Sequence, residues 1–295
     1  MSECTLSRLR SAGFVLIILT FLAAPALTQT QTRLNEPAAI ELSAGTAAKA
    51  AKPNDQPLGI SDYEKLLADD PSDVILQNNL GALYFAAGRY DEAAEMIARA
   101  AEARPDMWNL QVNASVAAAE RGDLKAALKF AQAGYTVGPK EIRAHEQLCD
   151  MYIALRDGSS AVPCFESLVK DRPGEAEDLL GYGEALMLAG DAIKAETAIR
   201  DVIKTSPRLA SAYNALGMAL FKQKKYMEAI NSFRDAISLA PERAQYRFNM
   251  GIADMAARNK DGALSQYNLL KQSDPSLADQ LYRAMFSDKL VAVSH

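Results

Sequence analysis

The strongest constraint on the fold is a proline that recurs every 34 residues. Seven of the twelve prolines share this spacing, namely Pro71, Pro105, Pro139, Pro173, Pro207, Pro241 and Pro275. Because proline interrupts a helix interior, each one marks a repeated break between helical segments. A period of this length indicates supersecondary units that cannot bury their apolar faces alone, so neighbouring units must stack.

Each unit has the pattern of a helical hairpin, which is clearest in Ala210–Arg243. Apolar residues at helical spacing occupy both halves of this unit, and the polar run Lys222–Lys225 separates them. A small residue recurs in the first half of the units, at Gly81, Ser115, Cys149, Gly183, Gly217 and Gly251. An alanine recurs in the second half, at Ala93, Ala127, Ala161, Ala195, Ala229 and Ala263. Small side chains at both places allow two helices to cross closely.

This 34-residue hairpin, with its small, aromatic and proline positions, resembles the tetratricopeptide repeat (TPR) family. The resemblance implies an all-α fold, a right-handed α-solenoid of six hairpins that binds other proteins. The repeats are predicted within 74–277, at 74–107, 108–141, 142–175, 176–209, 210–243 and 244–277. Residues 59–73 are expected to form an N-terminal half repeat, and residues 278–295 a capping helix and tail.

Several local features of the helices are predicted from single residues. Ser61 is expected to cap the helix Ile60–Asp69, and Pro163 to lie in the first turn of its helix. Gly88, Gly122 and Gly190 are expected as C-caps between paired helices: their freedom at positive φ suits the end of a helix. Asp254 replaces an apolar residue, so we expect an open site there and a pair with Arg258.

Residues 1–28 have the three parts of a secretory signal peptide. Arg8 and Arg10 form a basic start, Gly13–Leu22 an apolar core, and Ala24–Thr28 a small-residue cleavage region. The apolar run is shorter than the roughly 20 residues of a membrane-spanning helix. We therefore expect cleavage and a periplasmic or secreted protein. An uncleaved membrane anchor, with the repeats outside the cytoplasm, is the alternative. Residues 29–58 are expected to be a flexible linker.

The cysteines allow two interpretations. Loss of Cys4 with the leader would leave Cys149 and Cys164, which occupy level positions on the two helices of one hairpin. The pair is expected either to form a disulfide or to remain as two buried thiols.

The sequence contains no constellation that indicates catalysis or a cofactor. His145 and His295 are the only histidines, so no metal site is expected. The net charge of −5 and the lack of a clustered basic face disfavour nucleic acid as a ligand. A membrane partner is expected only if the leader stays uncleaved.

The TPR resemblance implies a concave groove lined by the first helices of the repeats. Three asparagines there resemble the row that holds peptide backbones in some TPR proteins, four carboxylates make the centre acidic, and the C-terminal third is apolar. The groove residues are Asn79, Phe85, Asn113, Glu146, Asp150, Glu177, Glu184, Met218, Phe221, Phe248, Asn249, Ile252 and Met255. We therefore expect a protein segment that carries basic and apolar residues.

These features together predict a non-enzymatic protein-interaction scaffold that binds a peptide segment outside the cytoplasm. A membrane-anchored TPR scaffold for assembly of an envelope or secretion complex is the alternative. The second repeat is the thinnest, with Ala114, Ser115, Ala118, Ala131 and Gly134 in place of large core residues. Because repeat arrays depend on neighbour interfaces, we predict that local opening begins in this repeat.

Overall fold

The computed structural model describes residues 58–290, with side chains described as far as residue 286. The expected leader, nearly all of the expected linker and the last five residues lie outside this range. In the described part of the chain every regular element is a helix, which confirms the all-α helical-repeat class.

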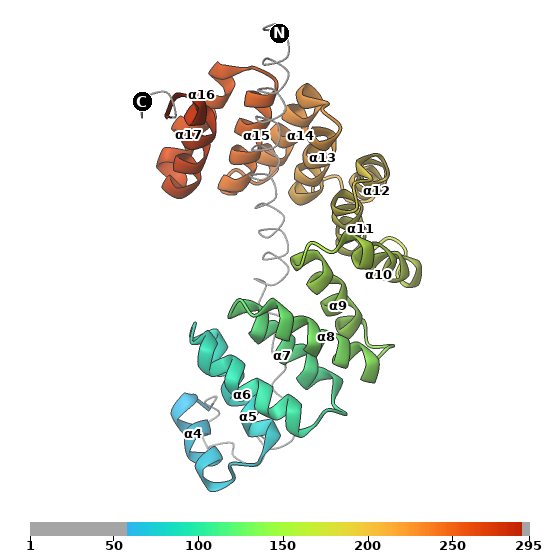
Figure 1. Cartoon of the computed structure of the whole chain (residues 1–295), viewed down its shortest axis with the longest axis vertical. Coiled ribbons are helices and arrows are strands. Elements are labelled where there is room, and N and C mark those ends of the chain that lie inside the picture. The colour runs from blue at the N-terminus through green and yellow to red at the C-terminus, as the bar shows by residue number, and fades with distance from the viewer. Residues whose placement is uncertain (1–57, 291–295) are drawn as a thin grey trace, which may run out of the picture. The chain divides into compact units, whose positions relative to one another are not determined.

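Fourteen helices make up the described residues, and Figure 1 labels them in chain order. Their bounds are α4 Ile60–Asp69, α5 Val74–Ala86, α6 Tyr90–Ala103, α7 Trp108–Glu120, α8 Leu124–Val137, α9 Ile142–Ala154, α10 Gly158–Asp171, α11 Ala176–Leu188, α12 Ala192–Thr205, α13 Ala210–Lys222, α14 Tyr226–Leu239, α15 Ala244–Ala256, α16 Lys260–Ser273 and α17 Pro275–Leu290. Each expected repeat contains one helix pair.

The residue that ends the first helix of each pair adopts a left-handed conformation. Gly88, Gly122 and Gly190 have φ values of 74°, 89° and 91°, which confirms them as helix-ending glycines. The same repeat position holds Arg156, Lys224 and Arg258 in the other repeats, with φ of 59°, 63° and 62°. A side chain with a Cβ atom is strained there, so the array imposes this backbone on three repeats whose local sequence disfavours it.

The chain divides into two compact units within α10, and each is described by itself. In residues 58–164, α4 packs on α5 and each following helix packs on the next as far as α9. Tyr63 of α4 is buried beside Leu76 and Leu80, and Leu66 and Leu67 are partly buried against the same cluster. Helix α4 therefore covers apolar side chains of α5 in the first full hairpin.

In residues 165–290, α11 to α16 pack in the same sequential way, and α17 packs on both α15 and α16. A Cβ atom added to Gly217 would lie 2.6 Å from the ring of Phe233, and one added to Gly251 would lie 2.7 Å from Leu281 of α17. These contacts explain the recurrent small residue, because a larger side chain would displace the helix packed against it.

Two local expectations about helix starts are wrong. The N-cap of α4 is Gly59 rather than Ser61, and its N–H donates to the carboxylate of Asp62 at 3.2 Å. Pro163 is the sixth residue of α10, beyond the first turn, because the helix already begins at Gly158. Its missing N–H therefore removes an interior helical bond that Ser159 would otherwise accept.

The expectation of an open site at Asp254 is also wrong. Asp254 is fully buried, and its Oδ1 accepts a hydrogen bond of 2.7 Å from Asn259 rather than pairing with Arg258. Its Oδ2 has no hydrogen-bond partner among the described residues. Desolvation raises the pKa of this carboxyl group, and the bond from Asn259 opposes that shift only in part. The left-handed backbone at Arg258 places Asn259, five residues after Asp254, within reach of this carboxylate.

Candidate functional site

The asparagines of the N-terminal unit connect neighbouring repeats. Asn113 Nδ2 of α7 donates to Asn78 Oδ1 of α5 at 2.9 Å, and Asn78 Nδ2 donates to Asn79 Oδ1 at 3.3 Å. All three side chains are buried. In the next repeat, Gln147 Nε2 donates to Ser115 Oγ at 2.9 Å. These amides therefore hold first helices to one another, because buried polar groups must find partners.

The same arrangement recurs in the C-terminal unit. Asn249 Nδ2 of α15 donates to Asn214 Oδ1 of α13 at 2.8 Å, and Gln245 Nε2 donates to Asn249 Oδ1 at 3.1 Å. Asn249 thus uses one of its two N–H donors and one of the two lone pairs of its oxygen within the array. Its side chain is fully buried, so these bonds connect helices rather than face a ligand.

The apolar groove residues of the C-terminal unit are much less accessible than a binding surface requires. Phe221 and Phe248 are 5% and 2% exposed, and Met218 and Ile252 are also buried. They lie on the first helices α13 and α15, which both pack extensively on α14. Met255 here, and Phe85 in the other unit, are partly exposed.

The four acidic groove residues differ in accessibility and belong to two helices. On α9, Glu146 is partly exposed and Asp150 is buried. On α11, Glu177 is exposed in the first helical turn and Glu184 is buried. Glu177 is therefore the candidate groove carboxylate that a ligand reaches most easily.

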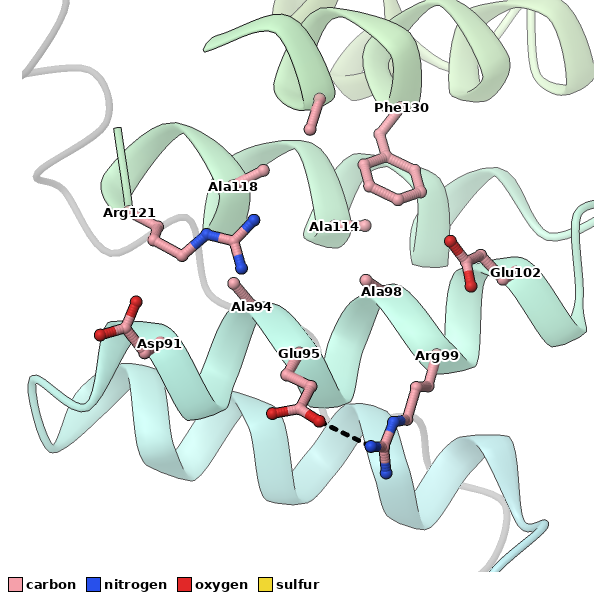
Figure 2. A pocket seen from close by; sticks show the side chains of 11 residues that line it. Asp91, Ala94, Glu95, Ala98, Arg99, Glu102, Ala114, Ala118, Arg121 and Phe130 are labelled. Atoms are coloured by element: carbon pink, nitrogen blue, oxygen red, sulfur yellow. Dashed lines mark hydrogen bonds and ion pairs between the residues drawn. The ribbon is translucent and has the colours of Figure 1, made fainter. Parts of the chain in front are cut away.

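A cavity of about 370 Å³ lies in the N-terminal unit among helices α6, α7 and α8. Figure 2 shows small side chains from two of these helices, Ala94 and Ala98 facing Ala114 and Ala118, with the ring of Phe130 at one end. Arg99 pairs with Glu95 at 2.6 Å beside the cavity. The cavity follows from the alanine-rich second repeat, because methyl groups leave space that larger side chains would fill.

An ion-pair cluster holds the fourth and fifth repeats together in the C-terminal unit. Glu196 of α12 accepts hydrogen bonds from Arg200 at 2.9 Å, from Gln223 at 2.8 Å and from Lys225 at 3.1 Å. Desolvation by itself would raise the pKa of Glu196, but these three donors outweigh it and lower the pKa to about 2. The cluster is therefore charged throughout the physiological pH range.

Cys149 and Cys164 are joined by a disulfide between α9 and α10, with their Cα atoms 5.5 Å apart. This is the bridged alternative of the two that the sequence left open. Cys149 is fully buried, and the imidazole of His145 lies one helical turn before it on α9. The His145 ring also packs on Tyr135, with ring centroids 4.7 Å apart.

Sequence reasoning missed the polar partners within the array. Sequence reasoning placed Asn78 and Asn214 on the groove face and did not predict that each pairs with an asparagine 35 residues later, one more than the repeat period. That spacing was a usable signal. The bond from Gln223 to Glu196 had no comparable signal, because it depends on how two hairpins stack.

Comparison with known proteins agrees with this architecture. Two family models, both described as tetratricopeptide repeat, match residues 57–141 and 150–243. This chain belongs to the tetratricopeptide repeat family. The matched segments cover more than half of the sequence and contain helices α4 to α8 and α10 to α14, with α9 matched only from residue 150.

Curated relatives of this TPR protein are distant and longer. Tetratricopeptide repeat protein 21B of Xenopus laevis is 28% identical over 125 residues, 42% of this chain and 9% of the relative. The Hsp70-Hsp90 organizing protein of Triticum aestivum is 26% identical over 210 residues, 71% of this chain and 30% of the relative. The match thus spans less than a third of either relative.

Solved structures support the fold. A tetratricopeptide repeat protein from Parabacteroides merdae has a TM-score of 0.68 at 16% identity, covering 87% of this chain and 98% of that one. YrrB, a TPR protein with an unusual peptide-binding site, has a TM-score of 0.52 at 16% identity, covering 68% and 100%. Among the described residues, none of the helices has the length and apolarity required to span a membrane.

Proposed function

We propose that this TPR protein is a non-enzymatic scaffold that binds a segment of another protein along the first helices of its repeats. The observation that carries the proposal is the exposed carboxylate of Glu177, at a position that the TPR resemblance assigns to ligand contact. Glu146, which is partly exposed on α9, is also a carboxylate at a position that the TPR resemblance assigns to ligand contact. In each unit taken by itself, one carboxylate and one partly exposed apolar side chain suit a segment with basic and apolar residues: Glu146 and Phe85 in the N-terminal unit, Glu177 and Met255 in the C-terminal unit.

The buried members of the groove support the array rather than the ligand in this proposal. Phe221→Asp or Phe248→Asp would place a charge in a closed core and unfold the repeat, so such variants do not test binding. Glu177 is suited to the test because its side chain is exposed and forms no hydrogen bond or ion pair with another of the described residues.

The experiment places a photoreactive phenylalanine analogue at Glu177 in the full-length protein. The matched control has the analogue at Glu166, an exposed carboxylate on α10, which is the second helix of the third repeat. We expect one protein to crosslink through residue 177 and not through residue 166, and Glu177→Lys to abolish its capture. Equal crosslinking at both positions, or capture that survives Glu177→Lys, would contradict binding at the first helices.

We also propose that the protein acts outside the cytoplasm. The pattern of residues 1–28 supports export, and the Cys149–Cys164 disulfide is consistent with an oxidising compartment. Mass spectrometry of the N-terminus after cell fractionation tests this: we expect a chain that begins near residue 29 in the exported fraction. An intact N-terminus in the membrane fraction would favour the anchored envelope or secretion scaffold instead.

The wheat relative's role in organising chaperones is not extended to this chain. The paired Lys and Asn side chains with which some TPR co-chaperones bind C-terminal carboxylates are missing from the matching positions. The acidic Glu146 and Glu177 would also repel an anionic tail. We therefore favour an internal basic segment over a chaperone C-terminus.

A further inference from the structure

Three metal-binding residue types meet inside the third repeat. His145 and Cys149 lie four residues apart on α9, and therefore on one face of the helix. Cys164 comes from α10, and the ligand atoms of the three residues all lie within 4.8 Å of one another. This cluster arises from a single hairpin of the N-terminal unit, so its geometry rests on the packing of two helices.

The disulfide controls whether these residues can bind a metal. In the oxidised protein both sulfurs are bonded to each other, and neither is a thiolate. Reduction by a dithiol transfers two electrons and two protons to the bridge, giving two thiols while the reductant becomes a disulfide. The separated sulfurs move to van der Waals contact, close to the roughly 3.8 Å between two thiolates in a tetrahedral Zn²⁺ site.

The ligand set suits zinc in charge as well as in geometry. Two thiolates neutralise one Zn²⁺, so a neutral centre replaces one buried and one partly buried thiol without adding a net charge there. His145 supplies an imidazole nitrogen, and its second nitrogen can keep a hydrogen bond that orients the ring. Packing of this ring on Tyr135 restricts its plane.

We propose that reduction of the Cys149–Cys164 disulfide converts this hairpin into a Zn²⁺ site formed by His145, Cys149 and Cys164. Binding of one Zn²⁺ releases the two thiol protons and leaves a fourth coordination position for water. Reoxidation by a disulfide of the same chemical class re-forms the bridge and releases Zn²⁺. The third repeat thus keeps a covalent or a metal link between α9 and α10 in either redox state.

The experiment uses Co²⁺ as a spectroscopic probe on full-length protein carrying Cys4→Ser, which removes the remaining thiol. We expect the reduced protein to bind one Co²⁺ with sulfur-to-cobalt charge transfer and the intense visible bands of tetrahedral Co²⁺, and Zn²⁺ to displace it. The oxidised protein should show neither signal. His145→Gln should weaken affinity about tenfold or more, whereas His295→Gln should leave it unchanged.

X-ray absorption of the reduced zinc-loaded protein provides a second measurement that needs no substitution at the site. We expect two sulfurs at about 2.3 Å and at least one nitrogen at about 2.0–2.1 Å. The proposal would be overturned by a zinc coordination shell without sulfur. It would also be overturned if folded His145→Gln bound Co²⁺ as tightly as the protein with His145, or if the oxidised protein bound Co²⁺ in tetrahedral geometry. Circular dichroism confirms that each variant keeps its helices.

Discussion

The second and fifth repeats are both helical hairpins, but different side chains pack between their two helices. In the fifth repeat Gly217 accommodates the ring of Phe233, which is fully buried. The same two positions in the second repeat hold Ser115 and Ala131. A hairpin with an aromatic wedge buries more apolar area than one closed by methyl and hydroxyl groups, so the fifth repeat gains more from its own packing.

The difference extends to the interface with the preceding repeat. Glu196 connects the fourth repeat to Gln223 and Lys225 of the fifth. Three repeats, or 102 residues, separate equivalent positions in these two parts of the array. The position of Glu196 is therefore occupied by Ala94 in the first repeat, and the position of Gln223 by Arg121 in the second. Both Ala94 and Arg121 line the cavity of about 370 Å³. Corresponding places in the array thus hold an ion-pair cluster in one unit and a solvent-open cavity in the other.

The largest expected effect is the loss of the aromatic wedge in the fifth repeat. Phe233→Ala should lower the free energy of unfolding by about 3–5 kcal/mol, because it removes a fully buried ring and leaves a cavity. Ala131→Gly, at the same position of the second repeat, should cost only about 1 kcal/mol. Urea denaturation measures both losses in the free energy of unfolding. Similar losses for the two variants would show that the second and fifth repeats gain equally from the packing within their hairpins.

Removal of the disulfide should have the next largest effect and should act on the weaker region. Cys149→Ala with Cys164→Ala opens a link across 15 residues, for which chain entropy gives about 3 kcal/mol. Because α9 packs on α8, we expect hydrogen exchange to rise in α7 and α8 more than in α13 and α14. If α7 and α8 remain the best-protected helices, local opening does not begin in the second repeat.

Loss of the Glu196 cluster should have a smaller, pH-dependent effect. Glu196→Gln should cost about 1–2 kcal/mol at pH 7. The pKa of Glu196 is lowered to about 2 in the folded protein, so its stabilisation is complete above the unfolded value of 4.5. It is lost as the pH falls through about 2. Thermal unfolding of wild type and variant should therefore converge between pH 5 and pH 2, and a constant difference would contradict this origin.

The smallest effect should come from filling the cavity beside the second repeat. Ala98→Leu places an apolar side chain into that space and should raise the free energy of unfolding by about 1 kcal/mol. The control is Ala101→Leu on the same helix. Ala101 is fully buried, so this larger side chain should lower the free energy of unfolding by about 1–3 kcal/mol. Equal destabilisation by both substitutions would mean that the cavity cannot accept a side chain.

The helix pairs were predictable because they depend on local sequence and a strict period. The 34-residue spacing of proline predicted hairpins, and Gly88 and Gly190 predicted helix ends that the structure confirms. Accessibility was not predictable in the same way. Phe248 and Ile252 lie at positions that the TPR resemblance assigns to ligand contact, yet both side chains are buried in the packed array.

Asp254 illustrates the same limit for polar residues. From sequence, Arg258 one helical turn later was the natural partner of this carboxylate. The structure instead ends α15 with Arg258 in a left-handed conformation, and Asn259 donates to Asp254. A sequence pattern identifies neighbours along a continuous helix, but it does not identify partners that a change in chain direction creates.

The array of helical hairpins follows from the amino-acid sequence alone, because period, helix breaks and small residues are local properties repeated along the chain. The accessible faces, the asparagine bonds between repeats and the cavity beside the second repeat follow from how the helices pack. It also joined Cys149 to Cys164 beside His145. These features depend on distances between helices, and small differences in side-chain volume at each stacked interface set those distances.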